Sequence, residues 1–139
     1  MRNMTNLLPG LLSCLLAATL SISMSVARAQ SDDPVENPRV LMKTTDGDIT
    51  IELFADKSPI TVENFLRYVD DGHYDGTVFH RVISNFMIQG GGFDTALKEK
   101  PTRDPIVNES KNKLHISRGT LAIPRTSDPD SAASQFFIN

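Results

Sequence analysis

The residues best suited to act on a ligand lie in one segment near the middle of the chain. Its sequence is Phe79-His80-Arg81-Val82-Ile83-Ser84-Asn85-Phe86-Met87-Ile88-Gln89-Gly90-Gly91-Gly92. The pattern predicts two strands, Val78–Ile83 and Phe86–Gln89, joined by a Ser-Asn turn and followed by three glycines. Because side chains alternate along a strand, Phe79, Arg81 and Ile83 are expected to share one face. An arginine among apolar neighbours lies either at a solvated rim or in a pocket.

The residues after the turn could complement this arginine. Phe86 and Met87 provide a large ring and a soft thioether, and Gln89 has both a hydrogen-bond donor and an acceptor. Together they suit a ligand that is apolar in its middle and amide-like at its ends, such as a peptide that contains a proline. Spacing alone leaves a structural role open, because a lone arginine on a strand is usually solvated and Phe and Met usually fill a core.

Two later segments favour the functional interpretation. They read Arg118-Gly119-Thr120-Leu121-Ala122-Ile123 and Ser134-Gln135-Phe136-Phe137-Ile138-Asn139. Together with the first segment, and in this order, they closely resemble the cyclophilin family of peptidyl-prolyl isomerases, whose hallmark runs read like FHRVI-x-x-FMIQGG, RGTLA and SQFFIN. The resemblance begins at about Arg39. It implies an enzyme that accelerates rotation about X-Pro bonds and needs no cofactor and no metal.

The resemblance also implies roles for individual residues. Arg81 matches the catalytic arginine of the family. The substrate-binding positions correspond to Phe86, Met87, Gln89, Arg125, Gln135 and Phe137. Phe86, Met87 and Phe137 match the apolar pocket for the proline ring, whereas Gln89 matches the amide that holds the substrate backbone.

The chain departs from the family pattern at three places. Arg125 stands where the family commonly has an asparagine whose main chain pairs with the peptide. Pro124 replaces a small residue and has no N–H to donate. The chain also ends at Asn139, directly after an apolar strand, whereas family members continue for several dozen residues. We therefore expect a fragment of a longer reading frame, without the C-terminal strands and the second helix.

The segments outside these runs predict the scaffold. Ile49–Leu53 alternates apolar and polar residues, and an Asp46-Gly47 pair separates it from the ordered segment Val40–Thr44, which indicates an antiparallel hairpin. Ser58 is expected to cap a helix that has Pro59 at its first position. The apolar stripe of this helix consists of Val62, Phe65, Leu66 and Val69, and Gly72 is expected to follow its end.

The remainder of the domain is predicted as loops and short strands. Asp94–Pro105 and Arg125–Ser131 are polar loops, and Thr120–Ile123 and Gln135–Ile138 are strands, whereas Ile106–Ser110 and Leu114–Ser117 are ambiguous. Short strands separated by turn signals predict a mainly β fold. The family resemblance implies more: a closed, eight-stranded antiparallel β-barrel capped by two helices.

The first 29 residues resemble a secretory signal peptide. Arg2 is followed by an apolar stretch from Leu7 to Val26, and Ala27-Arg28-Ala29 forms an A-x-A cleavage site before Gln30. A membrane anchor and lipoprotein processing at Cys14 are the alternatives. We expect residues 1–29 to be a cleaved leader, 30–38 a flexible lead-in and 39–139 one isomerase domain. The mature protein is then periplasmic or secreted, with no membrane span.

Composition excludes several classes of function. Without the leader the chain has 12 basic and 17 acidic residues, a net charge of −5 that disfavours nucleic-acid binding. The single cysteine lies in the leader, so neither a disulfide nor a thiol nucleophile is expected. The three histidines lack metal-ligand spacing, and no G-x-S-x-G motif supports a hydrolase. The glycine run has no following Lys-Ser/Thr pair that would indicate a phosphate-binding loop.

Two functions remain. The first is a monomeric isomerase that acts on proline-containing unfolded or extended polypeptides during the folding of exported proteins. The second is a chaperone-like module that binds proline segments with little catalysis. Arg81 separates these two hypotheses, because a binding module does not need a cation beside the prolyl nitrogen.

Overall fold

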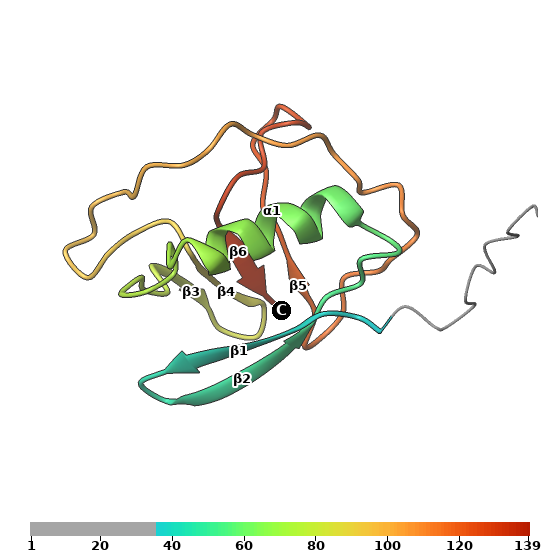
Figure 1. Ribbon diagram of the computed structural model, residues 1–139. Coiled ribbons are helices and arrows are strands. Elements are labelled where there is room, and N and C mark those ends of the chain that lie inside the picture. Colours follow the sequence, from blue (N-terminus) through green and yellow to red (C-terminus); the bar gives the residue numbers. More distant parts are fainter. Residues whose placement is uncertain (1–35) are drawn as a thin grey trace, which may run out of the picture. The chain divides into compact units, whose positions relative to one another are not determined.

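The computed structural model describes residues 36–139, which form six strands and one helix (Figure 1). In chain order these are β1 (Arg39–Thr44), β2 (Gly47–Glu52), α1 (Pro59–Asp70), β3 (Arg81–Ile83), β4 (Met87–Gly90), β5 (Leu121–Ala122) and β6 (Phe136–Ile138). The predicted leader, residues 1–29, and most of the predicted lead-in, residues 30–38, lie outside the described residues. Within residues 36–139, α1 is too short to cross a bilayer.

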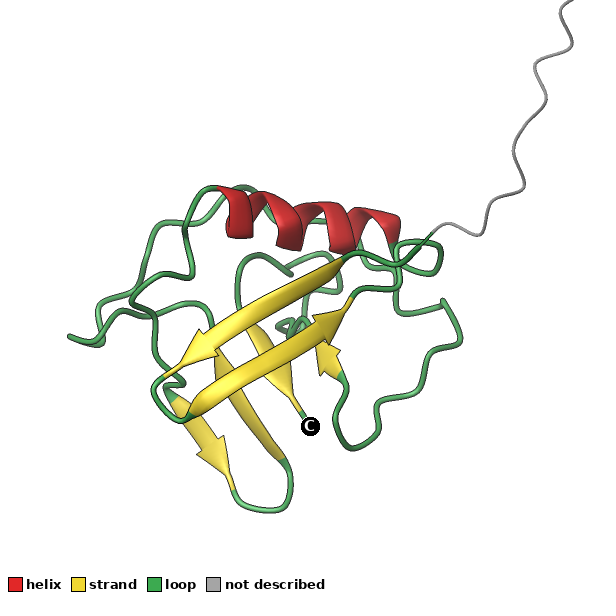
Figure 2. Ribbon diagram, turned by 60° about the horizontal axis from the view of Figure 1, so that its bottom comes forward, coloured by secondary structure: helices red, strands yellow, loops and turns green. Residues whose placement is uncertain are grey.

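The strands form two antiparallel sheets (Figure 2). One is the hairpin of β1 and β2, and the other has the order β3-β4-β6-β5. All pairings are antiparallel, which confirms the mainly β prediction. Within residues 36–139 the two sheets do not join into a closed barrel. The eight-stranded barrel therefore stays a prediction.

The first hairpin turns one residue earlier than the sequence predicts. Thr44 pairs with Gly47, so the two turn residues are Thr45 and Asp46, in place of Asp46 and Gly47. Gly47 is the first residue of β2 and has a φ of 130°, which favours glycine. The Thr44 hydroxyl donates a hydrogen bond to the Gly47 carbonyl at 2.7 Å. Gly47 thus allows the backbone conformation with which the chain leaves the turn and enters β2.

Helix α1 begins at Pro59, directly after Ser58, as predicted. Ser58 is the N-cap residue, as predicted, but its hydroxyl makes no capping bond and accepts from Asn112 Nδ2 at 2.6 Å. The free N–H groups in the first turn of the helix find their acceptor in Glu109 instead. Its carboxylate accepts from the backbone N–H groups of Ile60 at 3.2 Å and Thr61 at 2.7 Å. A residue far along the chain therefore caps this helix.

The end of α1 follows the predicted glycine signal. The N–H of Gly72 donates to the Val69 carbonyl and that of His73 to the Tyr68 carbonyl, both at 3.0 Å. With Gly72 at a φ of 64°, this is a Schellman motif. The motif turns the chain back toward the second sheet.

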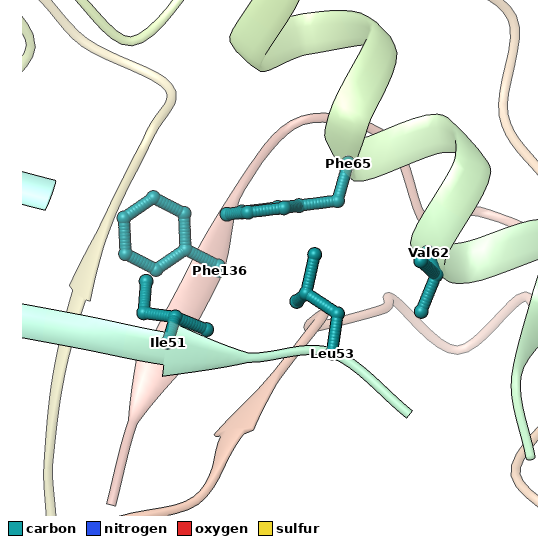
Figure 3. Packing of buried hydrophobic residues seen from close by; sticks show 5 residues of the cluster. All are labelled: Ile51, Leu53, Val62, Phe65 and Phe136. Carbon is teal, nitrogen blue, oxygen red and sulfur yellow. The ribbon is translucent and has the colours of Figure 1, made fainter. Parts of the chain in front are cut away.

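The core lies between α1 and strands of both sheets (Figure 3). Its buried cluster consists of Ile51, Leu53, Val62, Phe65 and Phe136. The predicted stripe of α1 faces this cluster. Val62 and Phe65 are buried in it, and Leu66 and Val69 are partly buried and pack against it. The helix also buries Tyr68 and Asn64, which the predicted stripe omits.

The predicted strand Val78–Ile83 is shorter in the structure, where β3 begins only at Arg81. Phe79 packs edge-on against Phe136 in the core, with ring centroids 6.0 Å apart. Arg81 is exposed and lies next to Gln89. The prediction that Phe79 and Arg81 share a face is wrong, because residues 78–80 are not in a strand and do not alternate as strand residues do.

Candidate functional site

A row of side chains crosses the second sheet on the face opposite the core. Arg81 of β3 pairs with Gln89 of β4, which pairs with Phe137 of β6, which pairs with Ala122 of β5. Directly paired residues in an antiparallel sheet project from the same face and lie side by side. The register therefore brings three predicted site residues from three strands into one line. We call Arg81, Gln89, Gln135 and Phe137 the row.

Hydrogen bonds connect the polar members of the row. Arg81 Nη1 donates to Gln89 Oε1 at 3.2 Å, and Gln89 Nε2 donates to Gln135 Oε1 at 2.8 Å. Both glutamines are half-buried, whereas Arg81 is exposed. Two amides thus restrict a guanidinium at the edge strand, where a long side chain would otherwise sample many rotamers.

The charge of Arg81 remains free for a ligand. Within residues 36–139, its guanidinium forms no ion pair, and its partner in the row is a neutral amide. A guanidinium has five N–H donors and no acceptor. The bond to Gln89 uses one of them, so further donors can point toward a bound molecule.

The apolar site residues lie at different depths. Met87 is 5% exposed and precedes Gln89 by two positions on β4, so both belong to the same face. Phe137 is half-buried within the row. Phe86 lies in the turn before β4 and is 57% exposed. The predicted Ser-Asn turn is present, because the Phe86 N–H bonds to the Ile83 carbonyl at 3.1 Å and Asn85 has a φ of 59°. It also includes Phe86, however, so the prediction that the second strand begins at Phe86 is wrong by one residue.

Arg125 lies outside the row, as Phe86 and Met87 do, and it belongs to a different part of the fold. It is exposed in the loop after β5, and its Nη1 donates only to the carbonyl of its neighbour Thr126, at 3.4 Å. Arg125 and Phe137 both line an open cleft of about 1010 Å³, which also borders β2 and α1. Phe137 is therefore the residue that the row and this cleft share.

Sequence reasoning gave Gly92 no role other than ending a strand. In the structure Gly92 is buried and packs against the side chain of Gln135. The run of three glycines was the one feature of the sequence that could have indicated a role for Gly92. Within residues 36–139, no group of three His, Cys, Asp or Glu side chains is placed to hold a metal ion.

Comparison with known proteins shows the family to which the chain belongs. Residues 39–139 match the family described as cyclophilin type peptidyl-prolyl cis-trans isomerase/CLD. The chain is 61% identical over 103 residues to a peptidyl-prolyl cis-trans isomerase of Acinetobacter baylyi, covering 74% of this chain and 55% of that protein. It is 56% identical over 100 residues to peptidyl-prolyl cis-trans isomerase B of Escherichia coli, covering 72% and 61%. The chain thus spans less than two thirds of the length of these relatives.

A solved structure shows the same fold. The chain is similar to a cyclophilin type peptidyl-prolyl cis-trans isomerase of Cryptosporidium parvum, crystallised in the presence of the dipeptide Ala-Pro. The TM-score is 0.61 at 31% sequence identity, and the match covers 73% of this chain and 66% of that one. The family match includes every residue of the row and both glycines that follow β4. The chain belongs to the cyclophilin-type peptidyl-prolyl cis-trans isomerase family.

Proposed function

We propose that this chain accelerates cis-trans isomerisation of X-Pro bonds, with Arg81 as the catalytic residue. The observation that carries the proposal is the hydrogen-bonded row, in which a guanidinium that has no anionic partner within residues 36–139 is held by Gln89, and Gln89 in turn pairs with Phe137. The proline ring would lie on Phe137, Met87 and Phe86. Gln89 and Gln135 would hold the peptide backbone on either side of it.

The chemistry follows from the amide bond itself. Resonance gives the bond partial double-bond character, and this creates a barrier of about 18–20 kcal/mol. Rotation breaks the resonance, and the prolyl nitrogen then has a lone pair that can accept a hydrogen bond. A donor directed at that nitrogen stabilises the twisted state more than the planar one, which is the condition for catalysis. Arginine suits this task because it stays protonated and forms no covalent intermediate.

We infer that the substrates are proline-containing segments of unfolded or extended polypeptides. The relative from Cryptosporidium parvum that was crystallised with Ala-Pro supports this class of ligand. The net charge of the predicted mature chain disfavours nucleic acid as a partner. Arg125, exposed at the border of the cleft, would contact the peptide through its main chain. We propose that the protein acts as a monomer.

We also propose that the two sheets belong to a closed barrel in a version of the protein that has the length of its relatives. The family resemblance supports this, and so does the open cleft between β2, α1 and β5. Additional strands in that cleft would cover exposed apolar residues such as Leu114 and Ile116.

Arg81→Ala tests the mechanism directly. We expect the rate of isomerisation of a proline peptide to fall at least about tenfold, because each 1.36 kcal/mol of lost transition-state stabilisation is about a factor of ten. The fold should stay intact, since the side chain is exposed. Arg81→Lys should recover only part of the rate. A guanidinium has several N–H donors in a fixed plane, so it can donate to Gln89 and to a ligand at once, whereas an ammonium lacks this arrangement.

Arg118→Ala is the matched control, since it removes an exposed arginine outside the row and should leave the rate unchanged. Circular dichroism and thermal melting confirm that each variant is folded. A folded Arg81→Ala protein with the wild-type rate would refute the mechanism. If the wild-type chain bound proline peptides without accelerating their isomerisation, the chaperone-like binding module would be the correct function.

We propose that the protein is exported to the periplasm or secreted, where it would assist the folding of other exported proteins. The signal-like residues 1–29 support this, although they lie outside the described residues. N-terminal sequencing of protein recovered outside the cytoplasm should begin at Gln30. An N-terminus that retains Met1, or a lipid on Cys14, would contradict cleavage at Ala29.

A further inference from the structure

A side chain at residue 92 would enter the space that the side chain of Gln135 now fills. A Cβ atom added to Gly92 would lie 2.7 Å from Gln135 Cγ and 2.9 Å from both Cδ and Nε2. Carbon atoms in contact are normally separated by about 3.5–4.0 Å. Even the smallest side chain at residue 92 would therefore displace the Gln135 amide.

The backbone does not require glycine at this position. Gly91 has a φ of +81°, in the region that disfavours other residues, but Gly92 lies outside that region. An alanine at residue 92 would therefore meet no strain of this kind in its own backbone. We therefore attribute the glycine at residue 92 to its close contact with the side chain of Gln135, which is a member of the row.

Arg81 determines how both amides of the row are oriented. A guanidinium can only donate, so Gln89 must turn its oxygen toward Arg81 and its NH₂ group toward Gln135. Gln135 must then present its oxygen to Gln89, and its own NH₂ group lies over Gly92. Donation thus runs in one direction along the row, from Arg81 to Gln89 and from Gln89 to Gln135, whose NH₂ group packs against Gly92.

We propose that Gly92 is a positioning residue that seats the Gln135 amide and, through Gln89, fixes the guanidinium of Arg81. The catalytic consequence rests on the proposed isomerase function, whereas the structural consequence does not. A side chain at residue 92 pushes the Gln135 amide away and breaks its bond to Gln89. Gln89 is then free to rotate, and Arg81 loses the acceptor that holds it.

The test uses the whole chain with Gly92→Ala, Gln135→Ala and the double variant. Gly92→Ala should lower kcat about tenfold, as expected for loss of a hydrogen bond that orients a charged group. The change should fall mainly on kcat, because the contact between Arg81 and the prolyl nitrogen is made in the twisted state. In the Gln135→Ala background, Gly92→Ala should have no further effect, since no amide remains to be displaced.

Side-chain amide signals in nuclear magnetic resonance spectra give a readout that does not depend on activity. Gly92→Ala should shift the NH₂ signals of Gln89 and Gln135 and the guanidinium signal of Arg81. Unchanged signals, or rate losses that multiply in the double variant, would overturn the proposal. If the wild-type chain showed no isomerase activity, the proposed function would fail, and these signals would still decide the role of Gly92.

Stability provides the last check. Because Gly92 is buried, Gly92→Ala could fail to fold. Under the proposal the double variant then recovers a folded state, because the collision is with Gln135. A double variant that stayed unfolded would show that Gly92 packs against something other than this amide, and the proposal would be wrong.

Discussion

Phe136 and Phe137 are neighbours on β6 with opposite surroundings. Phe136 is 3% exposed and its ring meets Phe65, Tyr74 and Phe79 edge-on, with centroids 5.9, 5.4 and 6.0 Å apart. Phe137 is half-buried and pairs with Gln89 in the row. The same strand thus has one face that stabilises the fold and one that is available to a ligand.

The same contrast separates the two glycines that follow β4. A Cβ atom on Gly91 would lie 2.9 Å from the ring of Phe136, whereas one on Gly92 would lie 2.7 Å from Gln135. Gly91 therefore faces the core and Gly92 faces the row. Aromatic rings in fixed edge-on contacts resist movement, but an amide at the end of a flexible side chain can be displaced. Equal substitutions on the two faces should have unequal effects.

The largest effect is expected for Phe136→Ala. It removes the ring that joins the second sheet to α1, and such core truncations cost about 3–5 kcal/mol of unfolding free energy. A typical domain has only about 5–15 kcal/mol in total, so the melting temperature should fall sharply. Thermal and urea denaturation measure the loss.

Phe137→Ala is the matched control for this comparison. It removes the same ring from the other face, and we expect a smaller loss of stability together with weaker binding of a proline peptide. Equal losses of stability in the two variants would show that both rings belong to one core. The distinction between the two faces would then be wrong.

Gly91→Ala should have the next largest effect. The new methyl group meets the ring of Phe136 and the Ser134 carbonyl, each at 2.9 Å, and the φ of +81° adds backbone strain. Overpacking of a core typically costs about 1–3 kcal/mol before such strain is counted. Denaturation should show Gly91→Ala to be less stable than Gly92→Ala. The reverse order would contradict the assignment of the two glycines to different faces.

Local signals predicted the scaffold well. The apolar stripe from Val62 to Val69 and the glycine at residue 72 located α1, because a helix and its end depend on neighbouring residues. The hydrogen bonds at the start of the same helix were not predicted, since Glu109 reaches them from a distant part of the chain. Phe79 was assigned to the wrong face because alternation was applied to residues 78–80, which lie outside the strand.

The site was predicted in part, for similar reasons. Short motifs named Arg81, Gln89, Gln135 and Phe137 as candidates, and the register of the sheet aligns Arg81, Gln89 and Phe137. Periodicity could not show that Gln135 would reach Gln89, since Gln135 precedes β6 and comes from a distant part of the chain. The role of Gly92 could not be predicted either, because it depends on which side chain packs over the glycine.

The smallest expected effect concerns pH, and it also distinguishes the two faces. The polar groups of the row are a guanidinium and two amides, and the row contains no histidine. On the core side, His73 packs against Tyr68, with ring centroids 4.7 Å apart, and its Nε2 lies 3.1 Å from the Gly91 carbonyl oxygen. Burial lowers the pKa of His73, as does the charge of Lys100, while the Gly91 carbonyl and Asp71 act in the opposite direction.

A lowered pKa means that the folded chain resists protonation of His73 more than the unfolded chain does. The unfolded state therefore binds more protons as the pH falls below about 6.5, and the stability that neutral His73 contributes is lost there. His73→Phe keeps a ring against Tyr68, and the Gly91 carbonyl still accepts from the Ser134 hydroxyl at 3.1 Å. Between about pH 7.5 and about pH 5.5, where carboxylates with pKa values near 4 stay charged, the melting temperature of the variant should fall less than that of the wild type. His115→Gln changes an exposed histidine, and the melting temperature of this variant should fall as much as that of the wild type. If His73→Phe and the wild type lost stability in parallel, His73 would not be the group that couples this core to pH.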